Sequence, residues 1–233
     1  MGAILVKGGK GLINDLVTRH GRPFRLEKIV NLDTGETVGH ELLQGARACG
    51  YRTQLQWRRF YEDLAVLIPD VVARLDGPLF VNVNGDQFID RSIRESLMTL
   101  TPLTSRLVFE WTETPWLSER NASVRDAIED FRDAGFVFAI DDIGTCGVDP
   151  IWRLQISGAA YAKIDGGYFH SALESTRGRA GLAALIRMLR DIGVRVVVEW
   201  IETPQHYQFA LQNGAHYGQG YLFSDFSVEV AHE

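Results

Sequence analysis

From Phe24 onward, short apolar runs alternate with longer amphipathic stretches. The runs with strand character are FRLEKIVNL, VGHELL, PLFVNVN, RLVFEWT, FVFAID, YAKID, VRVVVEW and YGQGYLF. Between them, residues 58–75, 121–135 and 179–193 repeat apolar positions at helical spacing, and the last two stretches end in glycine, a common helix stop. Strands that alternate with helices predict a parallel sheet of the α/β class. About eight strands in a chain of this length favour a closed (β/α)₈ barrel of the TIM kind.

One connection departs from this alternation. Only Asp33–Thr37 separate the first two apolar runs, which is too short for a crossover helix and typical of a hairpin. The barrel is therefore predicted to begin with an antiparallel strand. No domain boundary is indicated after Arg22. We expect a lead-in segment over residues 1–22, with a short helix over Leu12–Thr18, and one domain over residues 23–233.

Polar side chains stand where the predicted strands end. They are Glu41, Asn82, Asn84, Glu110, Glu113, Asp141, Asp142, Lys163, Glu199, Glu202 and Gln219. A single polar residue at such a place is ordinary in any α/β protein. In a parallel barrel, however, the carboxyl ends of all strands meet at one rim, where active sites lie. Because acids stand at the ends of most of the predicted strands, they are expected to meet at that rim, and this predicts an active site.

The residue types at this rim predict a metal site. Asp141 and Asp142 directly follow the apolar run FVFAI, and adjacent carboxylates repel each other at low dielectric unless cations compensate them. Carboxylate and amide oxygens suit Mg²⁺ or Mn²⁺, whereas zinc would call for His and Cys ligands. Two such ions about 4 Å apart would activate water for attack on a phosphodiester. Lys163 has two interpretations, as a group that holds that water or balances phosphate charge, and as a structural ion pair.

Composition excludes several classes of partner. The chain has 24 basic and 30 acidic residues and a net charge of −6, which argues against general binding of nucleic acid polymers or anionic membranes. No apolar run approaches the length of a membrane span. The two cysteines, Cys49 and Cys146, are far apart and show no disulfide or zinc pattern. A reducing, cytoplasmic setting is expected.

Taken together, these motifs resemble the EAL-domain family of cyclic di-GMP phosphodiesterases. The resemblance rests on Glu41-Leu42-Leu43 and on the motifs VNVN, FEWTET, DDIGT, KID, VVVEWIET and QGYLF, in this order, and it covers about Arg25 to Val230. Members of that family use two Mg²⁺ or Mn²⁺ ions to linearise cyclic di-GMP to pGpG on a barrel whose first strand is antiparallel. The resemblance therefore implies a cyclic di-GMP-specific phosphodiesterase.

Roles follow residue by residue from the matching motifs. The resemblance implies metal ligands at Glu41, Asn82, Glu110, Asp141, Asp142 and Glu199. It implies that Lys163 contacts the catalytic water and that Glu199 also corresponds to a proposed general base. Glu113 and Glu202 match acids that anchor the loop after the Asp141-Asp142 pair. Glu41, Leu43 and Gln219 are expected at the binding site.

The chain also departs from the family pattern. Gly45 stands where the family has an arginine that contacts the substrate, and Arg47 is the candidate replacement. The loop after Asp142 reads IGTCGVDP instead of the usual FGTGYSS. The alternative function is a catalytically weak or silent EAL domain that binds cyclic di-GMP or a protein partner. A homodimer and a regulatory protein partner are further expectations.

Overall fold

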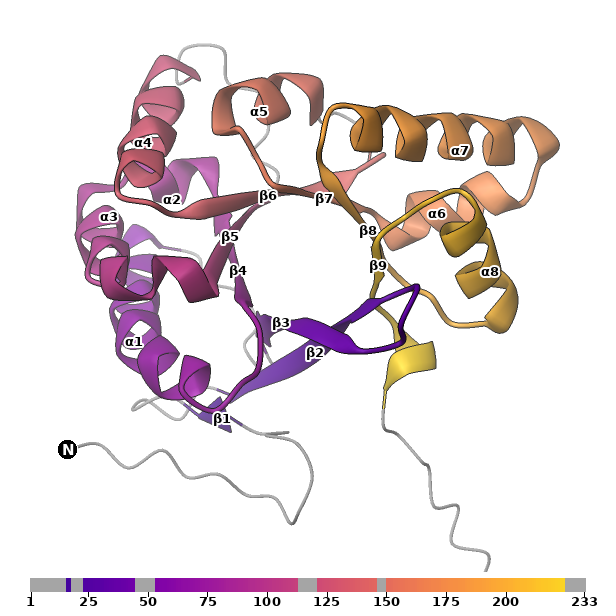
Figure 1. Cartoon of the computed structure of the whole chain (residues 1–233). Helices are drawn as coiled ribbons and strands as arrows, with labels where there is room; N and C mark the ends of the chain where they lie inside the picture. The colour runs from indigo at the N-terminus through magenta and orange to yellow at the C-terminus, as the bar shows by residue number, and fades with distance from the viewer. Residues whose placement is uncertain (1–15, 18–22, 45–52, 113–120, 146–149, 225–233) are drawn as a thin grey trace, which may run out of the picture.

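The computed structural model describes residues 16–17, 23–44, 53–112, 121–145 and 150–224. Figure 1 shows a ring of strands with helices around its outside. The strands are β1 (Leu16–Val17), β2 (Pro23–Asn31), β3 (Thr37–Gln44), β4 (Leu79–Asn84), β5 (Leu107–Thr112), β6 (Val137–Ile143), β7 (Tyr161–Ile164), β8 (Arg195–Val198) and β9 (Tyr217–Gly218). They pair in chain order, and a further pairing of β2 with β9 closes the barrel. The predicted barrel is confirmed.

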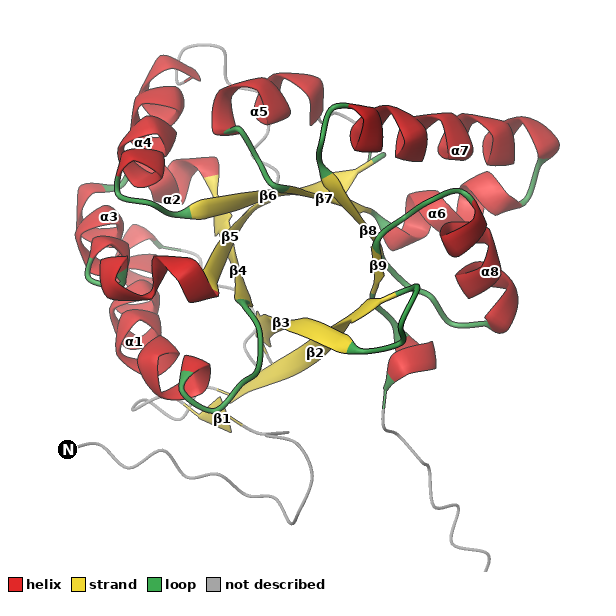
Figure 2. Ribbon diagram, in the orientation of Figure 1, coloured by secondary structure: helices red, strands yellow, loops and turns green. Residues whose placement is uncertain are grey.

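Helices follow most of the strands and cover the outer face of the barrel (Figure 2). They are α1 (Gln54–Val72), α2 (Gly85–Ile89), α3 (Arg91–Met98), α4 (Asn121–Asp133), α5 (Pro150–Ser157), α6 (Gly166–Leu173), α7 (Thr176–Asp191) and α8 (Pro204–Gln212), with short 3₁₀ turns η1 (Thr101–Arg106) and η3 (Tyr221–Phe223). The main apolar core lies between these helices and the outward side chains of the strands. Within the described ranges, no helix has both the length and the apolar character needed to cross a membrane.

The predicted hairpin joins β2 and β3. The two strands pair antiparallel from Phe24 opposite Gln44 to Val30 opposite Thr37. The Asn31 side chain accepts hydrogen bonds from the N–H groups of Asp33 (2.8 Å) and Thr34 (3.1 Å), and Gly35 takes the left-handed conformation (φ 74°) that the turn requires. From β3 to β9 every neighbouring pair is parallel. The antiparallel start of the barrel is therefore confirmed.

The barrel interior is layered, and the layers explain the site. An apolar layer near the amino ends of the strands consists of Ile29, Phe80, Val108, Ala139, Tyr161 and Val197. Side chains two positions apart on a strand point to the same side. Two positions beyond these residues on the parallel strands come Asn82, Glu110, Asp141, Lys163 and Glu199. A closed apolar floor thus supports a polar layer at the carboxyl mouth.

Three local expectations differ from the structure. Leu16–Val17 pair with Phe24 and Pro23 as strand β1, so the helix expected over Leu12–Thr18 is wrong at these residues, and residues 12–15 and 18 are not described. The run YGQGYLF was expected to form one strand, but β9 stops at Gly218. Beyond it, the N–H of Ile201 donates to Gln219 O (2.9 Å), and the N–H of Leu222 donates to Ile201 O (3.0 Å).

Asn84 is the third difference. Its side chain accepts the backbone N–H of Gln87 (3.0 Å) and caps α2, so it belongs to the helix and not to the polar layer. The division at residue 22 stays a prediction, since residues 18–22 are not described.

Candidate active site

Lys163 lies at the centre of the polar layer. Its ammonium Nζ is 3.0 Å from Glu41 Oε2, 3.0 Å from Glu110 Oε1, 3.3 Å from Asp141 Oδ1 and 2.7 Å from Glu199 Oε1. The lysine side chain is buried, with 1% of it exposed. Three acids in strands β3, β5 and β6, and Glu199 directly after β8, therefore converge on one cation. The predicted convergence of these residues is confirmed by their positions.

Glu41 is held by two amides. Asn82 Nδ2 donates to Glu41 Oε1 (2.8 Å), and Gln219 Nε2 donates to Glu41 Oε2 (2.6 Å). Together with Lys163, these bonds join β3, β4, β7 and the residue that follows β9 into one network. A carboxylate that accepts several hydrogen bonds has a single orientation, so Glu41 is the most rigidly oriented acid of the group.

The acids divide into one that is ionised and three that resist ionisation. Burial raises the pKa of Glu41, but Lys163 and the hydrogen bond from Gln219 more than offset this and leave that pKa at about 2. Burial raises the pKa of Glu110 well above its ordinary value, and the negative charge of Glu41 raises it further. Burial likewise raises the pKa of Asp141, and it raises that of Glu199 to about 8, although Lys163 opposes both shifts. Without a metal ion, burial therefore favours the protonated forms of these three acids.

Lys163 itself stays charged. Burial lowers its pKa, but Asp141, Glu110 and the other two acids outweigh this and raise the pKa well above its ordinary value. The resulting arrangement has one ammonium, one carboxylate with a lowered pKa and three acids with raised pKa values. A further cation at this place would favour the ionised forms of those three acids.

Asp141, Asp142 and Glu199 form the group best arranged for a metal ion. Each offers a carboxylate oxygen, and these three oxygens lie within 4.8 Å of one another. Asp142 has a left-handed backbone (φ 59°) at the place where the β6–β7 register shifts between Ile140 and Ile143. This backbone turn breaks the strand alternation and lets two consecutive side chains serve one site.

Several buried oxygens of the site make no hydrogen bond. They are both carboxylate oxygens of Glu110, Asp141 Oδ1 and Gln219 Oε1, which have no hydrogen-bond partner among the described residues, although Glu110 Oε1 and Asp141 Oδ1 lie within ion-pair distance of Lys163. Buried oxygens of this kind are costly unless a cation or a proton satisfies them. Carboxylate and amide oxygens are ligands for hard divalent ions. The residues present therefore fit a divalent metal site.

Two residues near the site escaped prediction from the sequence. Glu27 lies directly opposite Glu41 in the β2–β3 register, and burial together with the charge of Glu41 raises its pKa. The hairpin register could have revealed it, since a turn over residues 33–37 brings these two positions together. Arg153 in α5 donates to the backbone carbonyls of Trp111 (2.6 Å) and Asp141 (2.8 Å). No pattern in the sequence marks an arginine that bonds to the main chain.

The remaining predicted residues are less closely tied to the cluster. Glu113 and Arg47 lie outside the described residues, so their roles stay predictions. Glu202 is exposed, and its backbone N–H donates to His206 Nδ1 (3.4 Å). The loop that Glu202 is predicted to anchor is only partly described.

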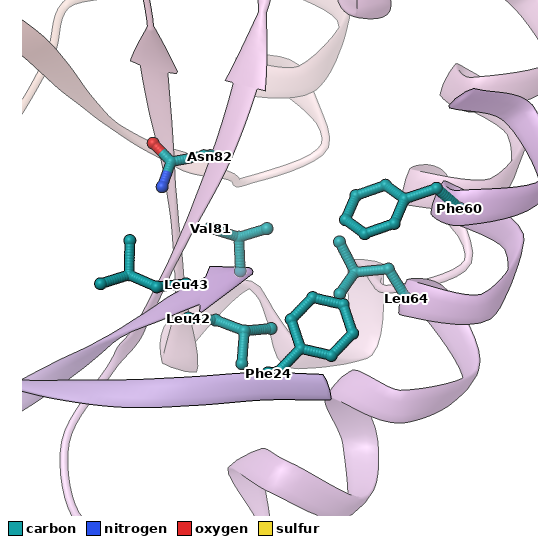
Figure 3. Close-up of a pocket in the computed structure, with 7 residues that line it drawn as sticks. All are labelled: Phe24, Leu42, Leu43, Phe60, Leu64, Val81 and Asn82. Atoms are coloured by element: carbon teal, nitrogen blue, oxygen red, sulfur yellow. The ribbon is translucent and has the colours of Figure 1, made fainter. Parts of the chain in front are cut away.

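Leu43 lies beside the cluster at the edge of an apolar cavity. The cavity has a volume of about 320 Å³ and is lined by Phe24, Leu42, Leu43, Phe60, Leu64, Val81 and Asn82. Figure 3 shows the two phenylalanines facing Leu42 and Leu64, with Leu43 and Asn82 on the other side of the strands. Asn82 therefore connects the cavity with the polar layer.

Residues 53–225 match the model of the EAL domain. The chain belongs to the EAL domain family. The match begins after Glu41, so the EAL-like motif Glu41-Leu42-Leu43 is supported by its place in the cluster and not by the family model.

Named relatives agree with this assignment. Over 179 residues the chain is 27% identical to the cyclic di-GMP phosphodiesterase RocR of Pseudomonas aeruginosa, which covers 73% of this chain and 44% of RocR. It is also 27% identical over 151 residues to the bifunctional diguanylate cyclase/cyclic di-GMP phosphodiesterase MucR of the same organism, covering 63% of this chain and 22% of MucR. The EAL chain thus spans less than half the length of these curated relatives.

Solved EAL structures share the fold. The EAL enzyme Bd1971 in its cGMP-bound form superposes with a TM-score of 0.72 at 22% identity, over 86% of this chain and 60% of Bd1971. BlrP1 of Klebsiella pneumoniae, solved with calcium and cyclic di-GMP, gives a TM-score of 0.71 at 22% identity, over 85% of this chain and 54% of BlrP1. At this level of identity, the likeness establishes the barrel fold alone.

Proposed function

We propose that this EAL domain is a metal-dependent phosphodiesterase that hydrolyses cyclic di-GMP to linear pGpG. The observation that carries the proposal is the polar layer at the carboxyl mouth of an EAL barrel, where four acids surround Lys163 within 3.3 Å. A weak or silent member would be expected to have lost some of these acids. The candidate ligands Glu41, Asn82, Glu110, Asp141, Asp142 and Glu199 are all present.

We propose Mg²⁺ or Mn²⁺, two ions together, as the cofactor. Asp141, Asp142 and Glu199 would hold divalent metal with Glu41, Asn82 and Glu110, because their oxygens are the hard ligands that these ions prefer. When bound, such ions lower the pKa of water and neutralise phosphate charge. The same chemistry suits a phosphodiester, whose charge must be balanced while water attacks phosphorus.

The chain's own residues supply orientation and proton transfer. Lys163 Nζ and Glu199 Oε1 are in direct contact at the mouth (2.7 Å), so an attacking water beside them would meet a donor and an acceptor at one place. Asn82 and Gln219 keep Glu41 in one orientation through bonds to both of its oxygens. A buried apolar layer lies next to the site in the barrel interior. A cytoplasmic location, a homodimer and a regulatory protein partner stay predictions.

The direct test is hydrolysis by the purified protein. Cyclic di-GMP is incubated with the protein and Mn²⁺ or Mg²⁺, and pGpG is measured by chromatography. Asp141→Asn is expected to abolish hydrolysis with the fold intact, because it removes a charged oxygen from the metal group. Asp133→Asn is the matched control, since Asp133 is exposed at the end of α4. Wild-type turnover in Asp141→Asn would refute the metal assignment.

A wild-type protein that forms no pGpG with either ion would refute the enzyme assignment. Calorimetry would then decide whether the domain still binds cyclic di-GMP, which is the result expected of the alternative, a binding module.

A further inference from the structure

Arg153 connects the carboxyl ends of two neighbouring strands that carry candidate metal ligands. It lies in α5 with 5% of its surface exposed, and it donates from Nη1 to Trp111 O (2.6 Å) and from Nη2 to Asp141 O (2.8 Å). Trp111 directly follows Glu110 in β5, and Asp141 directly precedes Asp142 in β6. Arg153 thus bonds to the main chain beside Glu110 and beside Asp142, at two strand ends that carry candidate metal ligands.

The strand pairing explains why these carbonyls need a partner. The pairing of β5 with β6 ends at Trp111 and Ile140, and the register of β6 with β7 shifts between Ile140 and Ile143. The carbonyls of Trp111 and Asp141 therefore lie where the regular ladders end. Buried carbonyls without a partner are costly, and the guanidinium satisfies both.

The bond to Asp141 O also restricts the next residue. A peptide unit is planar, so the carbonyl of Asp141 and the N–H of Asp142 turn together. Asp142 has a φ of 59°, a left-handed conformation that is unfavourable for a residue with a side chain. Holding the preceding peptide unit keeps Asp142 in this conformation, in which its carboxylate lies near those of Asp141 and Glu199.

We propose that Arg153 is a positioning residue of the metal site. By bridging Trp111 O and Asp141 O, it sets the spacing between Glu110 on one strand and the Asp141-Asp142 pair on the next. The inference rests on the proposed function, because it takes these carboxylates as metal ligands. Arginine suits the task because its planar fork reaches two acceptors at once, whereas a lysine ammonium is a single point charge.

Arg106 is a matched control at the other end of the barrel. It donates from Nε to Gly77 O (3.1 Å) and from Nη2 to the carbonyls of Val72 (3.2 Å) and Leu75. These carbonyls precede β4, and Arg106 precedes β5, so they lie at the amino ends of the strands. Arg106→Lys loosens a comparable set of bonds to the main chain without touching the polar layer.

The test is the affinity for Mn²⁺, measured by titration calorimetry on protein freed of metal with EDTA and then dialysed. Arg153→Lys is expected to raise the Kd for Mn²⁺ by about 10–100-fold, the usual effect of losing a residue that orients metal ligands. Arg106→Lys is expected to keep the Kd within about threefold of wild type, although it also lowers the melting temperature. Arg153→Met, which has no donor, should bind Mn²⁺ still more weakly, and circular dichroism checks its fold.

The possible results separate this inference from the proposed function. A Kd for Arg153→Lys within threefold of wild type, or an equal loss in Arg106→Lys, would overturn the positioning role and leave the enzyme assignment intact. A wild-type protein that binds Mn²⁺ but leaves cyclic di-GMP uncut would overturn the proposed function and leave the positioning role standing. A wild-type protein without affinity for Mn²⁺ or Mg²⁺ would overturn both.

Discussion

Replacing Glu110 by glutamine tests the charge state of the site most directly. Glu110 is fully buried, 3.0 Å from Lys163 Nζ, and neither of its oxygens has a hydrogen-bond partner among the described residues. Burial and the nearby Glu41 raise the pKa of Glu110 well above its ordinary value, so the metal-free protein favours the protonated form of this carboxyl. Glutamine has the shape of a protonated glutamate and cannot ionise. We therefore expect Glu110→Gln to raise stability without metal and to reduce the further stabilisation that metal provides.

Without metal, the substitution should stabilise the protein at neutral and higher pH. The folded-state pKa is raised, so the wild-type carboxyl favours folding only at low pH and loses this contribution as the pH rises from 4.5 toward the folded-state pKa. In that window the wild type must take up a proton on folding, which costs about 1.4 kcal/mol per pH unit. The variant does not have this cost. The difference in unfolding free energy should therefore grow with pH by about that slope.

With metal, the same substitution should reduce the stabilisation that Mn²⁺ provides. A ligand present at about 1,000 times its Kd stabilises the folded state by about 4.1 kcal/mol, and at about 10 times its Kd by about 1.4 kcal/mol. If losing one carboxylate weakens Mn²⁺ binding by about 100-fold, the variant forgoes about 2.7 kcal/mol of this stabilisation. For a domain of this size, the rise in melting temperature caused by Mn²⁺ should then be about 5–11 °C smaller than in the wild type.

Calorimetric melting of wild type and Glu110→Gln over pH 5–8, in EDTA and in Mn²⁺, measures both effects. Glu129→Gln makes the same chemical change on the exposed face of α4. It should change neither the pH dependence in EDTA nor the rise in melting temperature with Mn²⁺. Two results would refute the reasoning. An unchanged pH slope in EDTA would mean that Glu110 is ionised in the folded state, and an unchanged shift with Mn²⁺ would mean that it is no ligand.

Three further outcomes are expected. Lys163→Met should lower the unfolding free energy in EDTA by about 3–5 kcal/mol, because it removes the ion-pair partner of buried acids. Urea titrations measure this, and an unaltered value would show that protons alone neutralise the site. Mn²⁺ binding should release more protons at pH 7 than at pH 9, because Glu199, whose pKa is raised to about 8, loses its own proton between these pH values; calorimetry in buffers of different ionisation enthalpy measures the release. Gly166→Ala should cost about 1–3 kcal/mol, since a Cβ there would come within 2.1 Å of Trp200 Cγ and 2.6 Å of Trp200 Cβ. Most of this cost should vanish in a Trp200→Gly background, and additive costs would contradict the contact.

The parts of the fold that follow from local periodicity were predictable. The hairpin could be predicted because residues 33–37 are too few for a crossover helix. The barrel could be predicted from the alternation of strands and helices. The polar layer followed for the same reason. Since side chains repeat every two residues along a strand, Ala139 and Asp141 had to face the same interior, as did Tyr161 and Lys163.

Features that depend on contacts between distant segments were not predictable. The strand pairing of Leu16–Val17 depends on the edge that β2 presents near Phe24. The early end of β9 depends on Ile201, which takes the hydrogen bonds of the segment after Gly218. Arg153 bonds to backbone carbonyls, which every residue possesses, so no residue pattern identifies its partners.

The place of Lys163 brings its two sequence-based interpretations together. In the metal-free protein it is a structural ion-pair partner, because four acids lie within 3.3 Å of its ammonium and each raises its pKa. The same contacts keep the ammonium at the mouth of the barrel, beside Glu199, where a water-orienting group is needed. A divalent cation that drew those acids away would leave Lys163 with fewer partners and free its N–H groups for water or phosphate. The structural ion pair is therefore the resting state of the proposed catalytic group, and the two interpretations describe one residue before and after metal binds.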